Sequence, residues 1–99
     1  MTDQSGEDYG YIEKAKSFLR TRKSAYIQVF HGHGASKQVL IDLAGFCRAD
    51  ETTFHADPRK SDVLIGRREV WLRIQDHLNL TNEELYFLTT EGRRQHGRR

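Results

Sequence analysis

Residues 57–78 read DPRKSDVLIGRREVWLRIQDHL, and this stretch decides the fold. Asp57 followed by Pro58 is the order of an N-cap residue and a proline at the first helical position, where the missing N–H is harmless. The apolar residues that follow recur at helical spacing, with Val70 beside them: Leu64, Trp71, Ile74 and Leu78. We therefore expect a helix over 58–78 with Trp71, the single tryptophan, at the centre of the core.

Two helices are predicted before this one. Residues 9–30 carry a wide apolar stripe, typical of a helix that packs against two partners: Tyr11, Ala15, Phe18, Arg22, Ala25 and Val29, widened by Ile12, Leu19, Tyr26 and Phe30. Glycines at positions 32 and 34 end it. Residues 36–48 begin with an N-cap residue type, Ser36, and carry a second stripe. In this helix Ala44 and Gly45 are small enough to let another helix approach closely.

The last helix has the sharpest local signal. Thr81-x-x-Glu84 matches the capping box, and leucines at positions 80 and 85 match the hydrophobic staple. We expect this helix to span residues 82–90 and to end at Gly92. The fold class is therefore all-α, a small four-helix domain over residues 9–91, with a flexible acidic N-terminus at 1–8 and a flexible basic tail at 92–99. The expected core residues are Leu40, Leu43, Phe46, Trp71, Ile74 and Leu78, with Phe54 plugging the core from the loop at 49–57.

Length and composition exclude several classes of protein. The chain has 99 residues, which is one small domain with a thin core. No apolar run approaches the roughly 20 residues needed to cross a bilayer. The polar, acidic start lacks the apolar stretch of a secretory signal. A single cysteine, Cys47, excludes an internal disulfide and fits a reducing compartment.

Metal and catalytic sites are not supported by the spacing of the polar residues. His31, His33, Cys47 and His55 are residue types that zinc accepts, but their spacing matches no zinc pattern. We interpret them as loop histidines and a small core thiol. Acidic residues such as Glu83 and Glu84 gather at helix N-termini because of the helix dipole. The expectation is a non-enzymatic protein without a metal or another cofactor.

Two surfaces remain as binding candidates. The tail carries Arg93, Arg94, Arg98 and Arg99, which could neutralise phosphates in DNA, although the net charge is only +2. The alternative is a solvated basic terminus. Tyr86 and Phe87, beside leucines at 85 and 88, make the last helix apolar most of the way round. A thin core cannot bury all four side chains, so we expect Tyr86 and Phe87 to contact another protein chain.

Residues 26–88 resemble a family of small phage proteins. The resemblance is carried by Tyr26-x-x-Val29-Phe30, Gly34, Val39-Leu40, Asp42-Leu43-x-x-Phe46-Cys47, Thr53-Phe54, Asp57-Pro58, Gly66–Ile74 and Leu78-x-Leu80. The stretch GRREVWLRI at 66–74 is its most specific part. The family is the Bbp-nineteen-like family, whose type member comes from a Bordetella podovirus. The resemblance implies a tailed-phage or prophage protein encoded among head and packaging genes, and it implies no catalytic residues.

The resemblance and the residue chemistry both draw attention to Gly66-Arg67-Arg68. A glycine inside a helix predicts close packing or a functional face. Arg67 and Arg68 either bind a partner or form an internal salt bridge to Asp42 or Glu69. The favoured function is protein–protein binding to phage structural proteins, in virion assembly or as a minor virion component, in the bacterial host cytoplasm or the virion. The alternatives are a DNA-binding accessory protein of packaging or regulation and a small early phage protein that binds a host factor. The sequence leaves the oligomeric state open.

Overall fold

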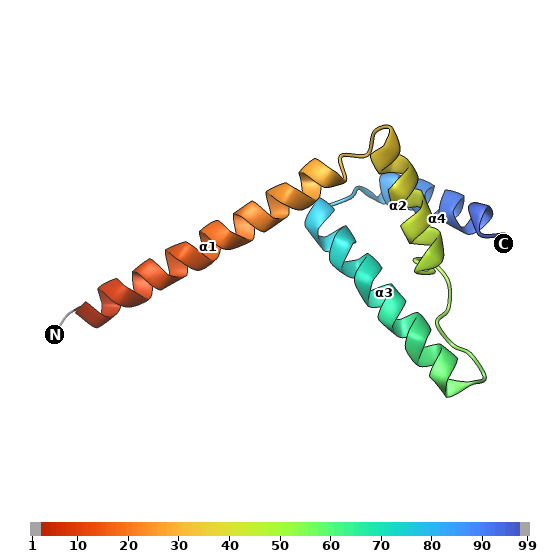
Figure 1. Ribbon diagram of the computed structural model, residues 1–99, viewed down its shortest axis with the longest axis horizontal. Helices are drawn as coiled ribbons and strands as arrows, with labels where there is room; N and C mark the ends of the chain where they lie inside the picture. Colours follow the sequence, from red (N-terminus) through yellow and green to blue (C-terminus); the bar gives the residue numbers. More distant parts are fainter. Residues whose placement is uncertain (1–2, 98–99) are drawn as a thin grey trace.

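The computed structural model describes residues 3–97, with side chains from residue 10 onward, and it contains four helices (Figure 1). They are α1 (Asp3–Val29), α2 (Ala35–Phe46), α3 (Pro58–Leu78) and α4 (Asn82–Gln95). No strand occurs among residues 3–97. The prediction of an all-α four-helix domain is confirmed.

The predicted N-caps of α3 and α4 are present, and each is formed by a side-chain hydrogen bond from the residue that precedes the helix. Asp57 Oδ1 accepts the Arg59 N–H at 3.0 Å, ahead of the proline at the start of α3. Thr81 Oγ1 accepts the Glu84 N–H at 3.1 Å, and Glu84 Oε1 accepts the Thr81 N–H at 3.0 Å, which completes the capping box. Ser36 is different: α2 begins one residue earlier, and the buried Ser36 hydroxyl accepts the Gly32 N–H across the turn.

Helices α2 and α4 cross at two glycines. A Cβ on Gly92 would lie 2.5 Å from the backbone nitrogen of Gly45 and 2.6 Å from the backbone oxygen of Ile41. A Cβ on Gly45 would in turn collide with the Gly92 carbonyl. The expectation that Gly92 ends the last helix is wrong, since α4 continues to Gln95. Glycine occupies position 92 because the backbone of α4 contacts α2 there and leaves no room for a Cβ.

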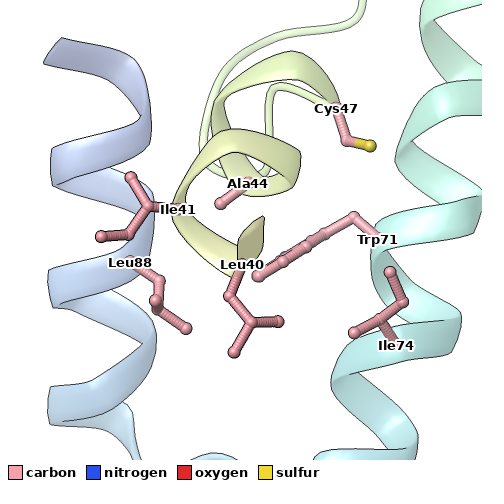
Figure 2. Close-up of a cluster of buried hydrophobic side chains, with 7 residues drawn as sticks. All are labelled: Leu40, Ile41, Ala44, Cys47, Trp71, Ile74 and Leu88. Atoms are coloured by element: carbon pink, nitrogen blue, oxygen red, sulfur yellow. The ribbon is translucent and has the colours of Figure 1, made fainter. Parts of the chain in front are cut away.

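The core lies between α2, α3 and α4 (Figure 2). Trp71, 1% exposed, projects from α3 toward Leu40 of α2, while Ile41 and Leu88 meet on the α4 side. The buried cluster consists of Leu40, Ile41, Ala44, Cys47, Trp71, Ile74 and Leu88, with Leu43 and Leu78 partly buried against it.

Two expected core residues lie outside the core. Phe46 is 45% exposed, because it occupies the last turn of α2, where its ring lies under the guanidinium of Arg67. Phe54 is 78% exposed. Hydrogen bonds between Ser61 and His55, and not burial of the Phe54 ring, fix this loop against the start of α3. Ser61 Oγ accepts the His55 N–H at 2.6 Å and donates to the His55 carbonyl at 3.1 Å.

Helix α1 runs away from the rest of the molecule (Figure 1). Its packing against α3 involves its final turns, where the Tyr26 ring stacks on His77 with centroids 4.1 Å apart. The radius of gyration is 18.2 Å, against about 13 Å for a compact chain of this length. The expectation that the stripe of α1 packs against two partners is therefore wrong for most of the helix, where its large apolar residues are exposed. The helix also begins at Asp3, well before the expected start near Tyr9, since acidic residues in the first turns favour the helix dipole.

Replacing Gly92 tests the close crossing of α2 and α4. We expect Gly92→Ala to lower the free energy of unfolding by about 1–3 kcal/mol, because the added methyl meets backbone atoms that cannot move aside. Urea unfolding followed by circular dichroism measures the change.

Gly66→Ala is the matched control within α3. A Cβ at Gly66 meets nothing within 4 Å, so the expectation of close packing at this glycine is wrong. The variant should gain up to about 1 kcal/mol from helix propensity alone. Equal stabilisation by both alanines would contradict the crossing described above.

Candidate protein-binding surface

A hollow of about 500 Å³ opens where the ends of the four helices meet. Its size is that of a typical ligand or anchor-residue pocket. The buried side chains of Leu40 and Leu88 form part of its lining, so the hollow reaches down to the core. The remaining lining residues are Ile27, Phe30, His31, Gly32, Lys37, Leu78, Leu80, Glu83, Glu84 and Phe87.

An aromatic ring and charged groups form the α2–α4 side of this hollow. Phe87 of α4 is 43% exposed, and the Nζ of Lys37 from α2 lies 4.8 Å from its ring centroid. On the first turn of α4, the hydrogen bond from the Thr81 backbone lowers the pKa of the Glu84 carboxyl. The hollow therefore combines apolar lining with charged groups of both signs.

The two aromatic residues predicted to contact a partner lie on the solvent side of α4. Tyr86 is 72% exposed, and Phe87 lines the hollow, while Leu88 between α4 and α2 is buried. Leu85 packs partly against the core. The expectation that α4 carries more apolar surface than the core covers agrees with these positions, and contact with a partner stays a prediction.

Arg67 and Arg68 both make contacts within the fold. The Arg67 guanidinium lies 4.2 Å from the Phe46 ring centroid. Arg68 Nη2 donates to the backbone oxygens of Arg48 and Glu51, which follow the end of α2. The internal alternative, a salt bridge to Asp42 or Glu69, is not what the structure has: Arg67 lies over a ring and Arg68 donates to two carbonyls, and partner binding by the two arginines stays a prediction. Arg68 thus ties α3 to the segment that follows α2.

Arg93 and Arg94 belong to α4 and are paired with acids of the same chain. Arg93 Nη1 lies 3.3 Å from Asp50 Oδ2, and Arg94 Nη2 lies 2.8 Å from Glu91 Oε2. The hydrogen bond from Arg94 lowers the pKa of the Glu91 carboxyl. The expected flexible tail therefore does not begin at residue 92. Arg98 and Arg99 lie outside the described residues.

One contact of the C-terminal segment was missed by the sequence reasoning. The Nε2 of His96 lies 3.1 Å from the backbone oxygen of Asp42 and 3.2 Å from Asp42 Oδ1. The two residues are far apart in the sequence, and no spacing rule connects them. Their contact follows from the Gly45–Gly92 crossing, which brings the end of α4 against the outer side of α2.

The histidines and the cysteine considered for a metal site are not gathered together. His31 and His33 stack on each other with centroids 5.7 Å apart, and His55 Nδ1 accepts the Asp57 N–H at 2.9 Å. Among the described residues, no cluster of three or more His, Cys, Asp or Glu side chains could hold a metal ion. Cys47 is buried, and this burial raises the pKa of its thiol, with the positive charge of Arg67 acting in the opposite direction.

Fold and surface together define a small all-helical domain with a partly apolar hollow beside its last helix. The sequence model of the family described as Bbp19-like phage protein matches residues 26–91, two thirds of the chain. The chain therefore belongs to the Bbp19-like phage protein family, and the resemblance read from the sequence is confirmed. Comparisons with curated proteins and with solved structures found no match. Within the described chain, no helix is long and apolar enough to cross a membrane.

Burial of Cys47 predicts an alkaline loss of stability. Above about pH 8.5 the thiol of the unfolded chain ionises, while the folded thiol, with its raised pKa, stays protonated. Protons are then bound more tightly by the folded state, so the free energy of unfolding falls as pH rises. The contribution of this thiol is fully present below the unfolded pKa.

The comparison with Cys47→Ala isolates this effect from the other titrating groups. The variant is less stable at pH 7 because it loses core volume, but its free energy of unfolding should fall less steeply between pH 7.5 and about 9.5. Urea titrations at several pH values give both slopes. Identical slopes would show that Cys47 is not held as a buried thiol.

Proposed function

We propose that this phage protein acts without catalysis, by binding another phage protein through the hollow beside α4. The observation that carries the proposal is the pairing of Phe87 with Lys37 at an open, largely apolar hollow. A partner side chain inserted there would cover Phe87 and meet charges of both signs, the arrangement of an interface anchor surrounded by a polar rim. Tyr86, on the same helix, extends the surface available to a partner.

Membership of this phage family supports a proposal for the place of action. Its resemblance implies genes among the head and packaging genes of tailed phages. We therefore propose a role in virion assembly or as a minor virion component, performed in the bacterial host cytoplasm and, if the protein is retained, in the virion. Protein binding is favoured over DNA binding because Arg93 and Arg94 are already paired with Asp50 and Glu91.

Capture from infected cells tests the binding surface. Immobilised protein should retain a phage-encoded head or packaging protein, identified by mass spectrometry. Phe87→Ala should reduce the retained amount at least about tenfold, as expected for an interface anchor. Phe54→Ala is the matched control, since Phe54 is an exposed phenylalanine in the loop before α3 and does not line the hollow.

Other captured partners would decide against this function. Retention of a host protein, lost in Phe87→Ala, would support the early host-factor alternative instead. Equal retention by both phenylalanine variants would remove the hollow from the interface. In each case circular dichroism must show that the variants keep their helices.

A DNA titration at two salt concentrations tests the alternative class of function. We expect no binding of duplex DNA at micromolar concentration and physiological salt. The comparison variant replaces four arginines by glutamine, at positions 93, 94, 98 and 99. Binding that is lost in this variant, and whose salt dependence flattens by up to about 0.9 per lost phosphate contact, would establish the DNA-binding function in place of the proposed one.

A further inference from the structure

Helix α1 carries an apolar stripe that the rest of the chain leaves uncovered. Tyr11 is 76% exposed, and the other large apolar residues along the projecting part of the helix are exposed as well: Ile12, Phe18 and Leu19. Figure 1 shows that this part of α1 extends beyond the other three helices. The family match begins only at residue 26, where α1 reaches α3. A solitary helix of this kind has little stability in water without a partner for its apolar face.

The charges along α1 are separated by sign. Residues 3–13 contain four acidic residues and no basic one, whereas residues 14–23 contain five basic residues and no acidic one. An antiparallel copy of the same helix places each acidic half beside a basic half. A parallel copy would place like charges side by side.

A seven-residue spacing along α1 indicates how two antiparallel copies of the helix align with each other. Asp8, Ala15 and Arg22 are seven residues apart, so they lie on one line along the helix, within the apolar stripe. Arg22 interrupts that stripe with a charge. Its Nε is buried and has no hydrogen-bond partner within the part of the chain that the structure describes. Its guanidinium lies 5.7 Å from the Phe18 ring centroid, still on the exposed stripe.

We propose that α1 pairs with α1 of a second copy of this chain, antiparallel and with the two helices crossing at Ala15. In this register Asp8 of each copy faces Arg22 of the other, so two charge pairs close the stripe symmetrically. Tyr11 faces Leu19, and Ile12 faces Phe18. The small Ala15 at the twofold axis lets the helices approach, and the interface is isologous, as in most dimers.

The groove at the base of α1 continues this surface. A hollow of about 420 Å³ lies between the last turns of α1 and α3, with apolar lining and a single charged residue, Arg73. In the proposed register the first turn of α1 of the second copy reaches this groove. The hollow beside Phe87 is not part of the proposed dimer interface. The experiments on the dimer and on the proposed function can therefore succeed or fail independently of each other.

Charge reversal combined with mass measurement tests the pairing. Sedimentation equilibrium of the full chain at about 100 µM should give twice the monomer mass of 11.6 kDa. Asp8→Arg and Arg22→Asp should each weaken the dimer at least about tenfold, since each places like charges opposite one another. The double variant, with both residues exchanged, should recover the dimer.

Mixing the two single variants gives the sharpest result. One copy then has arginine at both positions and the other has aspartate at both, so a one-to-one heterodimer should form in the antiparallel register. Glu13→Arg and Arg20→Asp are the matched controls, because both residues lie on the helix face away from the stripe, and they should weaken the dimer far less than the stripe reversals do. A monomeric wild type, or a dimer that the stripe reversals do not weaken or that mixing does not restore, would overturn the proposal.

Discussion

The close approach of α2 and α4 at Gly45 and Gly92 is the constraint on which the rest of the domain depends. Two helices can meet backbone to backbone only where neither has a Cβ in the contact. This contact brings Ile41 and Leu88 together and, through them, seats Leu40 against Trp71 of α3 (Figure 2). It also carries the end of α4 to the side of α2, where His96 meets Asp42. The core of this small domain therefore depends on the close crossing of α2 and α4.

The same crossing also determines which side chains of α4 are paired within the domain and which stay exposed. Because α4 is fixed near its C-terminal end, its first turns stand against the α1–α2 turn with Phe87 and Lys37 at an unfilled hollow. The arginines at the other end of α4 are drawn into pairs with Asp50 and Glu91. Arg93 and Arg94, which look free in the sequence, are therefore paired within the fold, whereas Phe87 and Tyr86 at the other end of α4 stay exposed.

Much of the helical framework is predictable from local sequence, and most of the tertiary contacts are not. Asp57-Pro58 and the Thr81–Glu84 capping box mark helix starts because their hydrogen bonds span only a few residues. Phe46 lies on an apolar stripe yet remains exposed, since burial depends on which helix lies opposite. Gly92 resembles a helix end because the sequence does not reveal Gly45 beside it. The α1 stripe shows the general reason: periodicity identifies an apolar face but does not identify what covers it.

The contact between Gly45 and Gly92 can be observed directly by nuclear Overhauser spectroscopy of the full chain. We expect a strong cross-peak between the α-protons of these two glycines, accompanied by cross-peaks from the Trp71 ring to Leu40. Cross-peaks from Trp71 to Leu40 without any between the two glycines would show that the core forms without the close crossing, and would contradict the account.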